Sequence, residues 1–199
     1  MDTLYANARI AGTDKPQDLL VEEGRFTRIG EGLARELPAQ GYDMTGIETV
    51  DLNGKLVCPP FCDTHLHLDY VFTARKPGAA NESGTLFEGI QRWSDTKADL
   101  TVDEVKTRAR KAVAMELRHG VQYIRSHADV TDPNLTSLKA LLELREELKD
   151  VVTIQIVSFP QEGMYSYRGP HGETGAELVE EGLRMGGDCL GGIPHHEAC

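Results

Sequence analysis

The sequence contains no apolar run long enough to cross a membrane as a helix. No stretch approaches the roughly 20 consecutive apolar residues that such a span needs. The first ten residues, MDTLYANARI, lack a basic region followed by an apolar one, so we expect no secretory signal. We therefore expect a cytoplasmic protein that does not bind membranes.

Positive charge is scarce in this chain. It has 21 Lys and Arg residues against 32 Asp and Glu residues, which gives a formal net charge of -11. Such an excess of acidic residues argues against a nucleic-acid backbone or an anionic membrane as a partner. Because many enzymes are acidic, the charge does not identify a substrate.

Cysteine motifs and phosphate-binding motifs are also missing. The four cysteines, Cys58, Cys62, Cys189 and Cys199, form no C-x-x-C pair, and we expect reduced thiols. No G-x-G-x-x-G follows the first predicted strand, which counts against a dinucleotide-binding fold. No P-loop, G-x-S-x-G or supported Cys-His pair is present either.

Residues 1–55 read as short strands and turns. Residues 18–30 predict two strands around a Glu-Gly turn, and residues 49–57 predict a second hairpin with Asn-Gly as its turn. This region is too small for a complete domain, and we expect it to form one part of a small β-sandwich.

From residue 56 onward, apolar runs alternate with helical patterns. The predicted strands cover residues 56–60, 121–125, 151–157 and 189–193. The predicted helices cover residues 85–93, 101–119 with Thr101 as N-cap, a segment opened by Asp132-Pro133, and 174–185. This order predicts a parallel sheet in an α/β fold. We expect about four βα units over residues 56–199, the N-terminal part of a (β/α)8 barrel, with open edge strands and an uncovered face.

Two histidines stand one residue apart in the stretch FCDTHLHLDY, which follows the first apolar run. Side chains of an extended segment alternate, so His65 and His67 should face the same way, with Asp63 and Asp69 sharing their parity. Two neutral imidazoles a few ångströms apart make half of a site for zinc, iron or a similar ion. The alternative is a pair of partly exposed histidines on a surface strand.

Other polar residues also follow predicted strands. His127 ends the second strand, where it could complete the site or support the barrel mouth through hydrogen bonds. His195, His196 and Glu197 follow the fourth strand. Neither the P-C-x-x-C of the zinc deaminases nor H-E-x-x-H fits within the remaining residues, so both motifs are rejected here.

Taken in order, these segments resemble bacterial cytosine deaminases of the amidohydrolase superfamily. The segment DTHLHLD at residues 63–69 resembles the first-strand motif of the superfamily. SGTLFEGIQRW at residues 83–93, FPQEG at 159–163 and Ile193-Pro194-His195 resemble cytosine deaminase more specifically.

The resemblance implies roles for individual residues. His65 and His67 match the first two metal ligands, the metal being iron or zinc, and Gln161 matches the glutamine that binds the amide edge of the pyrimidine. Leu86 matches an apolar residue near the substrate, although a packing role is equally open. A third ligand histidine, a glutamate proton shuttle and an aspartate ligand of the family would lie beyond Cys199. The chain is therefore expected to be the N-terminal half of a longer enzyme, homo-oligomeric in its full-length form.

The expected reaction is the hydrolytic deamination of cytosine to uracil and ammonia. A divalent metal would activate water for attack on the ring carbon, with a general acid/base moving the proton. With two family ligands and no shuttle, the isolated chain is expected to be inactive or nearly so. Two alternatives stay open. One is an amidohydrolase acting on isocytosine, an aminotriazine or another heterocycle, and the other is a non-catalytic remnant that binds a metal or a partner.

Overall fold

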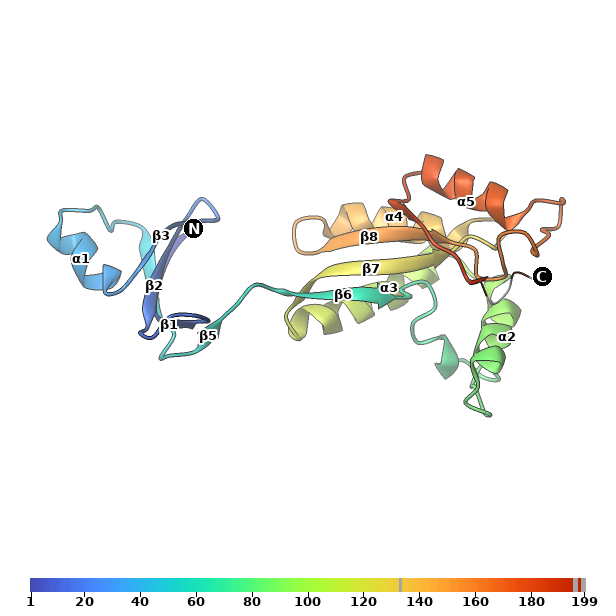
Figure 1. Ribbon diagram of the computed structural model, residues 1–199, viewed down its shortest axis with the longest axis horizontal. Coiled ribbons are helices and arrows are strands. Elements are labelled where there is room, and N and C mark those ends of the chain that lie inside the picture. The colour runs from blue at the N-terminus through green and yellow to red at the C-terminus, as the bar shows by residue number, and fades with distance from the viewer. Residues whose placement is uncertain (133, 195–196, 198–199) are drawn as a thin grey trace. The chain divides into compact units, whose positions relative to one another are not determined.

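The protein is described by a computed structural model that covers residues 1–132, 134–194 and 197. The chain divides into two compact units, Met1–Pro59 and Pro60–Cys199, each of which has its own sheet (Figure 1). Within the described ranges, no helix is long and apolar enough to cross a membrane.

The first unit is built around one central strand, β1 (Asp2–Ile10). Strand β1 pairs antiparallel with β2 (Gln17–Glu22), which pairs with β3 (Arg25–Gly30), and parallel with β4 (Ile47–Asp51) and β5 (Leu56–Val57). Leu4, Ala6 and Ala8 are buried, as the two-residue period of a half-buried strand requires. The short helix α1 (Leu33–Ala39) places Leu37 against Leu4.

The two predicted hairpins of this unit have different outcomes. The Glu-Gly turn is confirmed, since Glu23 and Gly24 both have positive φ between β2 and β3. The second hairpin is wrong, although its turn is present: Asn53 and Gly54 have positive φ, and the Lys55 N–H donates to the Leu52 carbonyl. Strands β4 and β5 do not pair with each other, because both lie parallel to β1, which offers them a long edge.

The second unit is a parallel α/β layer structure. Its strands are β6 (Phe61–Leu66), β7 (Val121–Asp129), β8 (Thr153–Phe159) and β9 (Cys189–Leu190), in the order β6-β7-β8-β9. Helices α3 (Val102–Arg118), α4 (Thr136–Leu148) and α5 (Gly175–Arg184) connect neighbouring strands. Helix α2 (Leu86–Lys97) and the short helix η1 (Thr73–Arg75) belong to the long connection after β6. Helix α2 lies at the carboxyl ends of the strands (Figure 1).

Helices α3, α4 and α5 bury one face of this sheet. Ile124, Ile154 and Ile156 from the strands join the same core cluster as Val113 of α3 and Leu141 of α4. The strand residues of opposite parity stay accessible chiefly toward the amino ends of the strands. Tyr123 is half-exposed, and Arg125 donates a 2.6 Å hydrogen bond to Gln155. This face, which the sequence predicted to be uncovered, is therefore partly polar.

Several predicted boundaries in this unit need correction. The first barrel strand was placed at residues 56–60, but β5 at Leu56–Val57 pairs with β1 and the barrel strand is β6. The error arose because β6 contains three polar residues in succession, Asp63 to His65, unlike a strand buried on both faces. Helix α4 begins at Thr136, later than predicted. The Asp132 carboxylate still accepts the N–H groups of its first turn, while Pro133 lies outside the described residues.

The N-cap predicted at Thr101 is confirmed, and it supports the longest helix of the described chain. The Thr101 hydroxyl accepts the Glu104 N–H, and Gly120 at φ +85° closes the other end of α3. We expect Thr101→Ala to lower the free energy of unfolding by about 1 kcal/mol. Denaturant unfolding followed by circular dichroism at the helix minimum measures this. Thr107→Ala, on an exposed turn of the same helix, is the control and should be neutral or slightly stabilising.

Candidate functional site

Three histidines from two strands meet at the carboxyl edge of the sheet. His65 lies near the carboxyl end of β6, and His67 directly follows that strand. His127 lies near the carboxyl end of β7. Strands β6 and β7 run parallel and pair as neighbours, so their carboxyl ends lie at one edge. One ring nitrogen from each histidine lies within 4.8 Å of the others.

The three rings pack closely. His65 and His127 stack with ring centroids 4.1 Å apart and planes 24° apart, and His67 lies 5.3 Å from each of them. Phe159 at the end of β8 meets the rings of His67 and His127 edge-on at 5.6 and 5.5 Å. An imidazole cluster against an aromatic wall therefore occupies this end of the sheet.

The surroundings of His67 and His127 favour the neutral form of these two imidazoles. Burial, reinforced by the nearby rings of His127 and His65, lowers the pKa of His67 to about 4. Burial and the His65 ring also lower the pKa of His127. Because a protonated imidazole cannot bind a metal, a lowered pKa preserves the ligand form at neutral pH.

The cluster fits a divalent metal ion on its own chemistry. The Nδ1 atoms of His67 and His127 are both buried and have no hydrogen-bond partner among the described residues. Buried polar atoms are normally satisfied, so each unpartnered nitrogen calls for an explanation. Neutral imidazole nitrogens that converge on one point are the donors that zinc and iron accept. His127 is therefore a candidate third ligand, beside His65 and His67.

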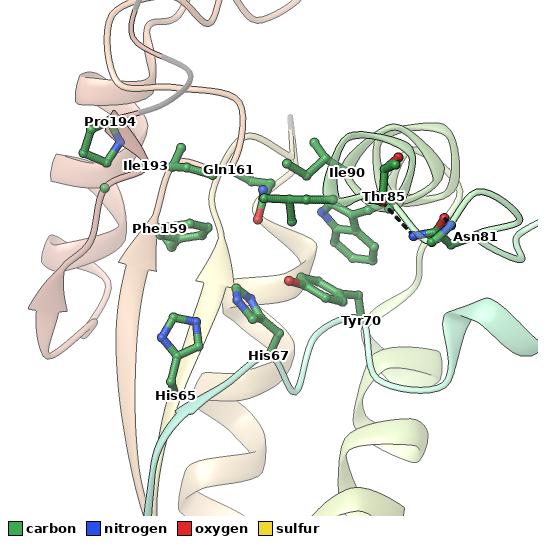
Figure 2. A pocket seen from close by; sticks show the side chains of 15 residues that line it. His65, His67, Tyr70, Asn81, Thr85, Ile90, Phe159, Gln161, Ile193 and Pro194 are labelled. Atoms are coloured by element: carbon green, nitrogen blue, oxygen red, sulfur yellow. Dashed lines mark hydrogen bonds between the residues drawn. The ribbon is translucent and has the colours of Figure 1, made fainter.

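A cavity of about 640 Å³ opens beside the histidines (Figure 2). His65, His67, Tyr70, Phe159 and Gln161 lie around it, and residues of α2 form its opposite wall. Other lining residues are Asn81, Gly84, Thr85, Leu86, Gly89, Ile90, Trp93, Gly192, Ile193 and Pro194. A concave, mostly apolar site with a few polar groups is the usual form of a small-molecule pocket.

Gln161, the predicted substrate-binding residue, lines this cavity. Its side chain is almost entirely buried, with the residue 5% exposed, and its backbone N–H donates to Phe159 and to the Asp129 carboxylate. Its amide group makes no hydrogen bond to any other described residue. A buried primary amide offers one acceptor and two donors, so this group is available to a ligand. Leu86 also lines the cavity and is 68% exposed, so it is not packed in the core.

Other residues singled out in the sequence have different places. The shared parity predicted that Asp69 would face the same way as the histidines. It does not join them, because the strand ends at Leu66. Its carboxylate is fully buried and accepts the N–H groups of Asp129 and Tyr70. Glu197 accepts the N–H groups of Met164 and Tyr165. His195 and His196 lie outside the described residues.

Sequence reasoning missed two aromatic residues of the site. The Tyr70 ring stacks on His67 at 4.5 Å, and Trp93 packs 4.8 Å from Tyr70. Both line the cavity. The helical pattern of residues 85–93 gave no separate signal for Trp93, and Tyr70 gave none beyond its closeness to the histidine pair.

Comparison with known proteins identifies the class of this chain. The model of the amidohydrolase family matches residues 48–185, and the chain belongs to this family. Its members are hydrolases that act on C–N bonds and are typically metal-dependent. The predicted α/β fold with a parallel sheet is confirmed, and its match to less than half of the neighbouring chain is consistent with the N-terminal portion of an amidohydrolase barrel.

Individual relatives are similar along two thirds or more of the chain. The crystal structure of 5-methylcytosine deaminase from Klebsiella pneumoniae liganded with 5-fluorocytosine is 41% identical, with a TM-score of 0.85 over 98% of this chain and 44% of that chain. N-isopropylammelide isopropyl amidohydrolase of Pseudomonas sp. is 30% identical over 96% of this chain and 45% of its own length. Pterin deaminase of Rhizobium rhizogenes is 28% identical over 68% of this chain and 31% of its own length. The chain thus spans less than half the length of these relatives.

The buried Asp69 carboxyl should make stability depend on pH. Burial raises the pKa of Asp69 from 3.8 to about 7. Between these values the folded state binds more protons than the unfolded state, so stability should fall as the pH rises from about 4 to about 7. The slope contributed by one group is at most about 1.4 kcal/mol per pH unit.

We expect Asp69→Asn to flatten this dependence, because the amide does not titrate. Urea unfolding at several pH values, followed by the fluorescence of the single tryptophan, Trp93, measures the slope. Asp99→Asn, at an exposed position, is the control and should leave the slope unchanged. An unaltered slope in Asp69→Asn would show that Asp69 is ionised throughout this pH range.

Proposed function

We propose that this chain forms the N-terminal half of a metal-dependent hydrolytic deaminase that converts cytosine, or a close relative of it, to the keto product and ammonia. The observation that carries this proposal is the cluster of His65, His67 and His127 beside a cavity that holds the free amide of Gln161. The similarity to 5-methylcytosine deaminase favours a pyrimidine over other heterocycles.

The cavity suits a flat heterocycle. Tyr70, Trp93 and Phe159 present aromatic rings to it, and the Gln161 amide can donate to a ring carbonyl while accepting from a ring N–H. Leu86 and Ile90 close the wall on the side of α2. These groups would bind the ring, fix its orientation and exclude bulk water.

The histidines would hold the metal. His65, His67 and His127 would supply neutral nitrogen ligands, with zinc or iron as the ion. The bound ion would supply an activated water for attack on the ring carbon that bears the amino group. The general acid/base that moves the proton stays a prediction, placed beyond Cys199, as do further metal ligands.

The proposal extends to the whole protein that contains this chain. We propose a cytoplasmic, homo-oligomeric enzyme, and the free thiols of Cys58, Cys62 and Cys189 favour a reducing compartment. The alternative substrate is another heterocycle, such as isocytosine or an aminotriazine. N-isopropylammelide isopropyl amidohydrolase among the relatives favours testing such compounds.

Metal binding tests the histidine cluster directly. Isothermal titration of the metal-free chain with Zn²⁺ should give one site. We expect His65→Ala, His67→Ala and His127→Ala each to weaken Zn²⁺ binding by a factor of about ten or more. Even the loss of a residue that only hydrogen-bonds to a metal ligand lowers metal affinity about 10–100-fold. His171→Ala, at an exposed loop position, is the control and should bind as the wild type does. Equal binding by all four variants would place the metal elsewhere.

Ammonia release tests the reaction. We expect little or no release from cytosine by the 199-residue chain, and release by the longest natural protein that contains it. In that protein Gln161→Ala should raise KM, because the amide would orient the ring before and during the reaction. Isocytosine and an aminotriazine, assayed in parallel, identify the substrate class. Metal binding without turnover of any of the three would favour the non-catalytic remnant.

A further inference from the structure

A buried lysine joins three segments beneath the cavity. Lys97 lies in the last turn of α2 and is 6% exposed. Its ammonium group lies 3.2 Å from the Asp129 carboxylate, 2.6 Å from the Glu162 carboxylate and 3.0 Å from the Thr131 hydroxyl. Helix α2, the end of β7 and the loop after β8 therefore converge on one ammonium group.

Asp129 carries this network toward the cavity. Its side chain is fully buried, and the oxygen that meets Lys97 also accepts the indole N–H of Trp93 at 2.7 Å. Its other oxygen accepts the backbone N–H of Gln161 at 3.3 Å and both the hydroxyl and the N–H of Thr131. One carboxylate thus contacts two residues that line the cavity.

Glu162 closes the network from the loop after β8. The same carboxylate oxygen that meets Lys97 accepts the hydroxyl of Ser94, one turn earlier on α2, at 2.6 Å. Its neighbour is Gln161. The loop that presents the amide is consequently attached to α2 at two points, Ser94 and Lys97.

We propose that Lys97 is a positioning residue, which sets the spacing between Trp93 on α2 and Gln161 on the loop after β8. This inference rests on the proposed function, because it concerns how the substrate pocket is held open at the right width. Lys97 does not line the cavity, and it acts through Asp129 and Glu162.

Physical chemistry favours this role over plain stabilisation. A buried ion pair gains little net stability over well-packed apolar residues, because desolvation of both charges offsets their attraction. It does restrict geometry, since each buried charge must keep its partners. Helix α2 also has few backbone contacts with the strands of the sheet. The polar network therefore holds α2 in place against the strand ends.

The chain provides a matched control for the test. Lys106 on α3 is 9% exposed and pairs with Glu143 and Glu147 of α4, both at 2.6 Å. It is a second buried lysine between two carboxylates, but it is remote from the cavity. Lys97→Met and Lys106→Met both keep an unbranched side chain and remove one charge.

Trp93 reports on the pocket directly, because it is the only tryptophan and is 4% exposed. In the unliganded chain, we expect Lys97→Met to increase acrylamide quenching of Trp93 on the order of twofold and to shift its emission to longer wavelength, as local opening exposes the indole. Lys106→Met should leave the quenching and the emission wavelength of Trp93 unchanged, even if it lowers the unfolding midpoint as much as Lys97→Met does. Lys97→Arg, which keeps the charge, should recover most of the wild-type protection.

Binding of 5-fluorocytosine, followed by quenching of Trp93, is the second measurement. We expect Lys97→Met to weaken binding about tenfold, a change of about 1.4 kcal/mol, and Lys106→Met to bind as the wild type does. Equal effects of both lysine variants on Trp93 and on binding would overturn the positioning role, as would no effect of Lys97→Met.

If Lys97→Met does not fold, Glu162→Gln carries the test, because it removes one ion pair at the accessible edge of the network and should raise acrylamide quenching in the same direction. If the wild-type chain does not bind 5-fluorocytosine, the proposed substrate class fails for this chain, while the acrylamide comparison in the unliganded protein still decides the role of Lys97.

Discussion

Parallel pairing of β6, β7 and β8 is the constraint on which the rest of the site depends. In a parallel sheet, neighbouring strands end at the same edge, so residues far apart in sequence meet there. Leu66 pairs with Ser126, His127 with Val157, and Asp129 with Phe159. This register aligns the histidines with the aromatic wall. A one-residue slip would turn His127 into the helical layer and break up the cluster.

Buried carboxylates hold the loops that leave this edge. Asp69 accepts the N–H of Asp129, and Asp129 in turn binds Trp93, Lys97 and Thr131. Ordinary packing would not fix these loops, because irregular backbone carries polar groups that need partners when buried. The chain satisfies them with side chains that lie directly behind the cavity, so the same contacts that permit burial also define the pocket.

Prediction from sequence succeeded where the signal was local. The N-cap at Thr101, the Glu-Gly turn and the alternation of strands with helices were all visible, because caps, turns and hydrophobic periods act over a few residues. It failed where the choice depended on a distant partner. Residues 56 and 57 were assigned to the barrel, but they pair with β1 in the sheet of the first unit. Asp69 was grouped with the histidines by parity, but burial of its carboxylate beneath β7 decided its place.

The sequence by itself determined the residues available for chemistry: two histidines separated by one residue after an apolar segment, and a glutamine after the third barrel strand. Only the tertiary structure decided that His127 joins the pair, that Tyr70 and Trp93 line the cavity, and that Lys97 links α2 to the strand ends. The physical reason is that spacing along a chain fixes only neighbours within one element. Convergence across strands depends on register and burial, which arise when the sheet assembles.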